Sequence, residues 1–101
     1  MSQLMKQARQ MQAQLAVAQA ELAQKNFVGS AGGGMVTATV TGAQELVGIT
    51  ISPEVVDPED IEMLEDLVLA AVRQGFEAAA AAASDKLGGL TGGLDLGGLL
   101  G

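Results

Sequence analysis

The stretch from Ser52 to Val72, SPEVVDPEDIEMLEDLVLAAV, constrains the fold more than any other part of this sequence. Pro53 cannot donate a hydrogen bond to a sheet, so it indicates the end of a β-rich region. Asp57 followed by Pro58 is typical of a helix start, with aspartate as the N-cap and proline at the first helical position. The chain is therefore expected to change from strand to helix within this stretch.

The helix predicted after Pro58 carries a wide apolar surface. Its apolar side chains recur at helical spacing from Ile61 to Ala79 and cover roughly 200° of the circumference, whereas one core-facing stripe needs about half of that. We therefore expect this helix to pack on its own sheet and also on a second copy of the chain. The residues expected at that dimer interface are Leu64, Val68, Val72 and Phe76.

The N-terminal residues 2–25 predict a second long helix, because no glycine or proline interrupts them. An apolar seam runs along it at spacings of 4, 3, 4, 3 and 4 residues, through Leu4, Ala8, Met11, Leu15, Ala18 and Leu22. The helix either lies on the domain's own sheet or projects and pairs with a helix of a second subunit. At 1.5 Å per residue it would span about 36 Å, which is longer than so small a domain is wide and favours projection. Leu4, Met11, Leu15 and Leu22 are then further dimer contacts.

Three short strands are predicted between the two helices, at residues 27–31, 35–41 and 45–51. In the second strand Val36, Ala38 and Val40 alternate with threonines and are expected to face the core. In the third, Val47, Ile49 and Ile51 are expected to share one face. The fold class is therefore α+β, with the order α-β-β-β-α and a three-stranded antiparallel sheet. Residues 1–87 are expected to form one domain, and the glycine- and leucine-rich residues 88–101 a flexible tail.

The composition excludes several functional classes. The 101 residues include no cysteine or histidine, so disulfides, the usual general base and the soft metal ligands are missing. Phe27 and Phe76 are the only aromatic residues, which argues against base stacking on single-stranded nucleic acid. Glu62 and Asp66 share a helix face, but an acidic helix start exposed to water explains them better than a metal site. We expect no enzyme, no metal, no cofactor and no small-molecule substrate.

The termini and hydropathy predict a cytoplasmic protein. The N-terminus is polar and glutamine-rich, unlike a signal peptide. No uninterrupted apolar stretch reaches the 18 or more residues that a membrane span needs. We therefore expect no membrane interaction.

Charge is distributed unevenly along the chain, whose net charge is −7. Up to Lys25 the three cations Lys6, Arg9 and Lys25 outnumber the one carboxylate, Glu21, whereas the remainder holds two cations and eleven carboxylates. The asymmetry indicates an interaction of the N-terminal segment with a polyanion.

Four motifs together resemble the YbaB/EbfC family of bacterial nucleoid-associated proteins. They are MKQARQMQ in the first helix, VGSAGGGMVTATVTG across the strands, ISPEVVDPEDIEMLEDLVLAAV, and the tail motif GGLTGG. The resemblance implies a homodimer whose long helices project like the arms of tweezers, bind duplex DNA, change its conformation and act in nucleoid organisation and gene expression. It also implies DNA contacts by Lys6, Arg9, Arg73 and Lys86.

This sequence departs from the family pattern where relatives place cations along the arms. It has glutamines in the first helix and the alanine run Ala78–Ala83 in the last. Two functions therefore stay open. One is weak, mostly sequence-independent binding of duplex DNA through its backbone, and the other is an acidic dimeric module for protein interaction.

Overall fold

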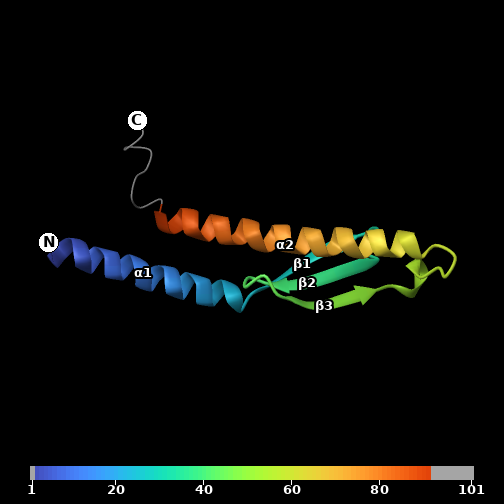
Figure 1. The fold of residues 1–101 in the computed structure, drawn as a ribbon, viewed down its shortest axis with the longest axis horizontal. Coiled ribbons are helices and arrows are strands. Elements are labelled where there is room, and N and C mark those ends of the chain that lie inside the picture. Colours follow the sequence, from blue (N-terminus) through green and yellow to red (C-terminus); the bar gives the residue numbers. More distant parts are fainter. Residues whose placement is uncertain (1, 92–101) are drawn as a thin grey trace, which may run out of the picture.

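The structure is a computed structural model that describes residues 2–91, with side chains up to residue 88 (Figure 1). Its elements are α1 (Ser2–Ala23), β1 (Asn26–Ala31), β2 (Val36–Thr41), β3 (Leu46–Ile51), a 3₁₀ turn (Pro53–Val55) and α2 (Ile61–Thr91). The predicted order α-β-β-β-α and the α+β class are confirmed. Because α2 continues to Thr91, the tail predicted at 88–101 begins inside the helix, and its remainder lies outside the described residues.

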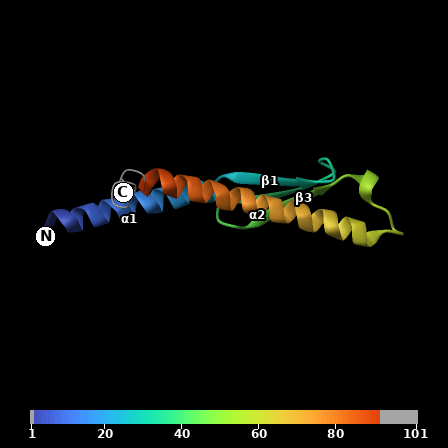
Figure 2. The ribbon, with the colours of Figure 1, turned by 90° about the horizontal axis from the view of Figure 1, so that it is seen from above.

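The three strands form one antiparallel sheet in the order β1-β2-β3. Between them, Gly32, Gly33 and Gly34 turn the chain with φ angles of 63°, 68° and 92°, which side chains with a Cβ rarely adopt. Helix α2 packs across β1 and β2 but leaves β3 largely uncovered (Figures 1 and 2). One face of the sheet is therefore only partly protected by its own helix.

The core lies between β2 and α2. Val36, Ala38 and Val40 are fully buried, as their alternation predicts. Ala71 of α2 is buried with Val36 and Ala38 in one cluster, and Leu64, Leu67, Val68 and Val72 pack around it. The core is small and aliphatic.

Helix α1 does not lie on the sheet. It runs antiparallel beside α2, and both helices extend past one end of the strands (Figures 1 and 2). Only the C-terminal half of α1 is buried, at Ala18 and Leu22, while Leu4 near its start is 68% exposed. The chain is accordingly elongated, at 68 × 29 × 16 Å. The first helix thus projects, but the helix beside it is α2 of its own chain, and its pairing with a helix of a second subunit stays a prediction.

The start of α2 differs from the prediction. Asp57 does not cap it, because the Asp57 carboxylate accepts a hydrogen bond from the backbone N–H of Glu59, at 3.0 Å, within a tight turn that also contains Pro58. Asp60 is the capping residue, and its carboxylate accepts from the backbone N–H of Met63 at 3.2 Å. Two aspartates three residues apart offer equivalent caps, and the path of the chain from the 3₁₀ turn selects the later one.

The third strand also differs from simple alternation. A bulge next to Val40 places Leu46 opposite it, not Val47. Leu46, Ile49 and Ile51 therefore lie opposite the buried residues of β2, yet all three remain exposed because α2 does not cover β3. Strand β3 thus adds an open apolar surface to the sheet.

Candidate nucleic-acid interface

The exposed start of α1, residues 2–9, forms what we call the arm tip. Lys6 and Arg9 are three residues apart, so their side chains lie on the same side of the helix. Both are exposed, and with Ser2, Gln3 and Met5 they line a shallow open hollow. The structure thus brings together the two cations that the sequence predicts on the first helix.

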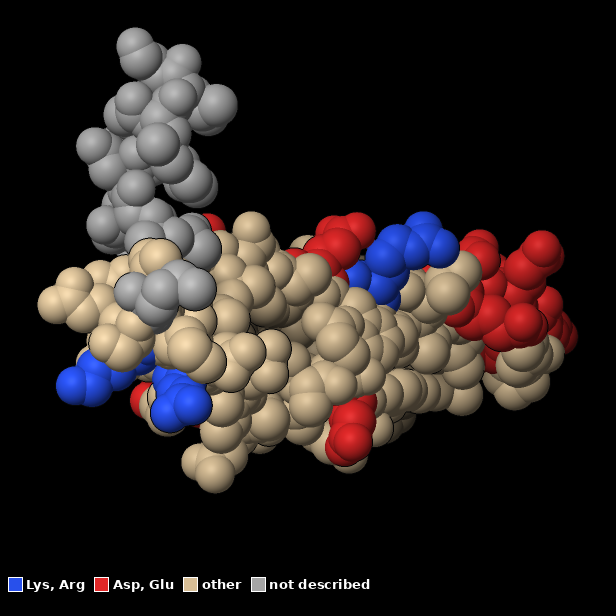
Figure 3. All heavy atoms as spheres, turned by 60° about the vertical axis from the view of Figure 1, so that its left-hand side comes forward, with Lys and Arg blue, Asp and Glu red and all other residues tan. Residues whose placement is uncertain are grey.

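The opposite end of the molecule is acidic. Seven of the twelve carboxylates lie between residues 54 and 66, in the 3₁₀ turn, the following loop and the first turns of α2; they are Glu54, Asp57, Glu59, Asp60, Glu62, Glu65 and Asp66. Figure 3 shows blue side chains at the end that comes forward and a dense red group at the far end. Another blue group lies beside the red one, so only the cations of the arm tip, Lys6 and Arg9, are separated from most carboxylates along the long axis of the chain.

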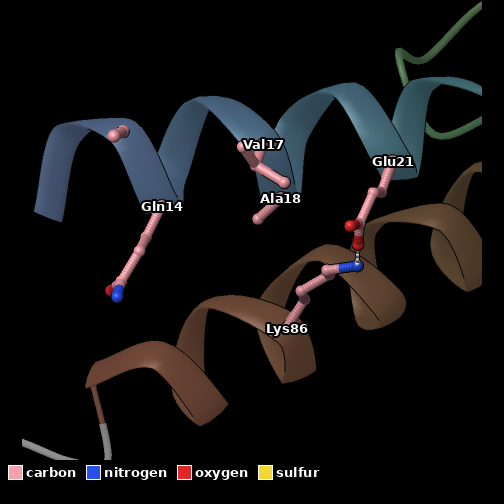
Figure 4. A pocket seen from close by; sticks show the side chains of 6 residues that line it. Gln14, Val17, Ala18, Glu21 and Lys86 are labelled. Atoms are coloured by element: carbon pink, nitrogen blue, oxygen red, sulfur yellow. Dashed lines mark hydrogen bonds and ion pairs between the residues drawn. The ribbon is translucent and has the colours of Figure 1, made fainter. Parts of the chain in front are cut away.

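Lys86 does not lie free on the surface. Its ammonium reaches from α2 to the Glu21 carboxylate on α1, donating a hydrogen bond and forming an ion pair (Figure 4). The Lys86 ammonium, first by this hydrogen bond and then by its charge, lowers the pKa of the Glu21 carboxyl below its ordinary value of 4.5. Sequence reasoning treated Glu21 only as one charge among several, since nothing local to residue 21 indicates a partner 65 residues away.

Arg73 occupies a different surface from Lys6 and Arg9. It lies on α2 and lines an apolar groove together with Leu69, Val72 and Phe76. A second groove continues this surface past Val68 and Leu64 to Ile51 of β3. We call this combined surface the α2–β3 face; its residues are Leu46, Ile49, Ile51, Leu64, Val68, Leu69, Val72 and Phe76.

The residues predicted at a dimer interface fall into two groups. Leu64, Val68, Val72 and Phe76 are half-buried and line the grooves of the α2–β3 face. On α1, Leu22 is buried within the chain, Met11 and Leu15 are half-buried, and Leu4 is open to solvent. The apolar arc of α2 is thus wider than the part of it that the chain's own sheet covers.

The described residues contain neither a metal-binding cluster nor a membrane-spanning helix. Within residues 2–91, no cluster of three or more carboxylates is arranged to hold a metal ion. No helix within the same range is both long and apolar enough to cross a membrane.

The sequence matches the model of the YbaB/EbfC DNA-binding family over residues 1–94. The chain belongs to this family. A curated relative from Rhodococcus opacus (strain B4), named "Nucleoid-associated protein", is 54% identical over 101 residues, covering 100% of this chain and 89% of the relative. One of the same name from Clostridium perfringens (strain SM101 / Type A) is 52% identical over 99 residues, covering 98% of this chain and 88% of the relative.

A solved structure supports the fold of this YbaB/EbfC family member. The crystal structure of an uncharacterized protein from Helicobacter pylori matches with a TM-score of 0.73 and 24% identity. The match covers 84% of this chain and 89% of the other. The helix, three-stranded sheet and long second helix are thus a known arrangement.

Proposed function

We propose that this YbaB/EbfC family member is a homodimer that binds duplex DNA through phosphate contacts by Lys6 and Arg9. The observation that carries the proposal is a pair of exposed cations at the tip of a projecting helix, with most carboxylates at the opposite end. The relatives' name, nucleoid-associated protein, supports DNA as the partner and the cytoplasmic nucleoid as its place. There the protein affects DNA conformation and gene expression.

The net charge of −7 does not prevent this binding, because the charges are far apart. Electrostatic interactions are screened over about 8 Å at physiological ionic strength. The chain is 68 Å long, and the acidic end at residues 54–66 and the arm tip lie towards its opposite ends. Phosphates at the arm tip therefore experience mainly Lys6 and Arg9, while the acidic end repels DNA from the remainder of the molecule.

The α2–β3 face supports the homodimer. Leu46, Ile49, Ile51 and Leu69 are exposed on it beside half-buried apolar residues of α2. Contiguous exposed apolar surface of this kind marks interaction sites in soluble proteins. A second copy supplies the same kind of surface, so that a symmetric pair buries both. Such a dimer presents two arm tips and four cations.

The salt dependence of DNA binding tests the proposal. Each phosphate contact contributes about 0.9 to the slope of log K against log salt, so four contacts give a slope near −3.6. Raising the salt from 50 to 200 mM should weaken binding roughly 150-fold, and the affinity at physiological salt should lie near the non-specific range of about 10⁻⁴ to 10⁻⁶ M. Scrambling the DNA sequence should change little, because phosphates carry no base identity.

Substitution at the arm tip identifies the surface. The double variant Lys6→Gln with Arg9→Gln should lose DNA retardation but keep its dimer mass and melting temperature. Lys25→Gln is the matched control for a single substitution, since Lys25 is an exposed cation outside the arm tip. It should leave the slope near −3.6, whereas Lys6→Gln alone should reduce it to about −1.8. Tight binding to one sequence, or binding that survives the double substitution, would contradict the proposed surface.

The second candidate is a dimeric module that binds proteins instead of DNA. The dense acidic end favours it, because seven carboxylates are exposed there. No retardation of duplex DNA at 50 mM salt would favour this function over DNA binding.

A further inference from the structure

The ion pair between Glu21 and Lys86 occupies an accessible position between the two helices. The Lys86 side chain is 26% exposed and the Glu21 side chain 54%. Together with Ala13, Gln14, Val17 and Ala18 they line an open groove between α1 and α2 (Figure 4). Both charges can therefore meet a solute that approaches along the arm.

We infer that Glu21 withholds Lys86 from DNA, so that this carboxylate sets how tightly the arms hold the phosphate backbone. The inference rests on the proposed function, since it concerns the strength of the same DNA contact. It assigns Glu21 the role of an internal competitor, occupying the ammonium that would otherwise contact a phosphate.

Lys86 lies within range of a duplex held at the arm tip. Its partner Glu21 is twelve residues from Arg9 on the same helix, which is about 18 Å along the axis. Duplex DNA carries one negative charge per roughly 1.7 Å of its length. A duplex that follows α1 from the arm tip therefore brings phosphates close to the groove that contains Lys86.

The competition holds across the physiological pH range. An ammonium paired with a carboxylate of its own chain must give up that partner before it contacts a phosphate. Because Lys86 lowers the pKa of Glu21, this carboxyl stays ionised well below neutral pH. The pair is thus a standing restraint, and a substitution at Glu21 is the direct way to remove it.

Three variants measured in the full chain by DNA retardation at several salt concentrations test the inference. Glu21→Gln should free Lys86 in both subunits and raise the number of contacts from four to six. The slope should steepen from about −3.6 to about −5.4, and the loss of affinity between 50 and 200 mM salt should grow from about 150-fold to about 1,800-fold. Lys86→Gln alone should leave the wild-type slope unchanged, and Glu21→Gln combined with Lys86→Gln should also return the wild-type slope.

Asp85→Asn is the matched control for the change in net charge, since Asp85 is adjacent to Lys86 in sequence and also carries a carboxylate. It should leave the slope near −3.6. The swap of Glu21→Lys with Lys86→Glu exchanges the two charges and keeps an ion pair between the helices. The swapped protein should keep the wild-type dimer mass and melting temperature.

Each outcome is decisive. An unchanged or shallower slope for Glu21→Gln would overturn the inference, and so would a shallower slope for Lys86→Gln, which would place Lys86 on DNA already. An equal steepening by Asp85→Asn would also overturn it by showing a general charge effect. If neither the wild type nor Glu21→Gln binds at 50 mM salt, the proposed function fails and the inference with it.

Discussion

At the scale of single residues, Gly29 decides how closely α2 approaches the sheet. A Cβ at this position would lie 2.1 Å from the carbonyl oxygen of Ala71 and 2.3 Å from the backbone nitrogen of Gly75. Both neighbours are backbone atoms of the helix, so neither can rotate away. The buried contact between α2 and β1 therefore needs glycine at residue 29.

Substitution of Gly29 by alanine should destabilise the fold severely. Overpacking costs about 1–3 kcal/mol and occasionally more, and a clash with backbone should reach at least the upper value. That is a large part of a typical stability of about 5–15 kcal/mol. Gly48→Ala is the control, since open space surrounds that position in β3. Urea unfolding should show a large loss for the first variant and little change for the second; equal effects would contradict the close approach.

The stability that Glu21 contributes should depend on pH. Because pairing with Lys86 lowers the folded-state pKa of Glu21, its contribution is fully present above the ordinary value of 4.5 and is lost as the pH falls through the lower folded value. The wild type should therefore exceed Glu21→Gln in stability by a constant amount from pH 6 to 7, and the difference should shrink below 4.5. Unfolding curves of both proteins at several pH values measure this difference. A difference that grows in acid would show that the pair does not stabilise the folded chain.

At the scale of elements, the two helices divide their apolar surfaces differently. Helix α1 buries Ala18 and Leu22 near its C-terminal end and leaves Leu4 exposed. Helix α2 buries Ala71 against β2 and keeps a second apolar side towards the uncovered β3. Each helix thus leaves apolar surface that its own chain does not cover, and this surface supports the proposed homodimer.

Leu69 provides the test of the dimer at this scale. It is 54% exposed on the α2–β3 face, so a charge is tolerated there by one chain alone but is buried if a second copy covers it. Leu69→Glu should reduce the mass in light scattering from twice 10.2 kDa to 10.2 kDa. Val28→Glu is the matched control, because Val28 is 59% exposed on the other face of the sheet. If only the Val28→Glu variant loses the dimer, the interface lies on the opposite face of the sheet and not on the α2–β3 face.

At the scale of the whole molecule, the elongated shape keeps the cations of the arm tip far from most of the carboxylates. The arm tip and the acidic end lie towards opposite ends of a chain 68 Å long, far beyond the screening distance in physiological salt. The protein can therefore attract a polyanion at its arm tip and repel the same polyanion at its acidic end. The charge that matters for DNA is local, and the value of −7 for the chain describes neither end.

The sequence alone determined the order of the elements and the residues of the core strand. Those features are local, because alternation at Val36, Ala38 and Val40 and helical spacing in α1 and α2 follow from backbone geometry within one element. The family match at residues 1–94 agrees with the motifs that suggested it. The start of α2 was predicted less well from the sequence, because Asp57 and Asp60 are equally suitable as helix caps.

Only the tertiary structure decided which surfaces and charges are free. That β3 stays uncovered depends on how α2 crosses the sheet at Gly29, and no periodicity in β3 itself reports it. That Lys86 is paired depends on the position of α1 beside α2, which brings residue 21 to a partner 65 residues away. Sequence patterns describe neighbours along the chain, whereas the availability of a cation for DNA depends on neighbours in space.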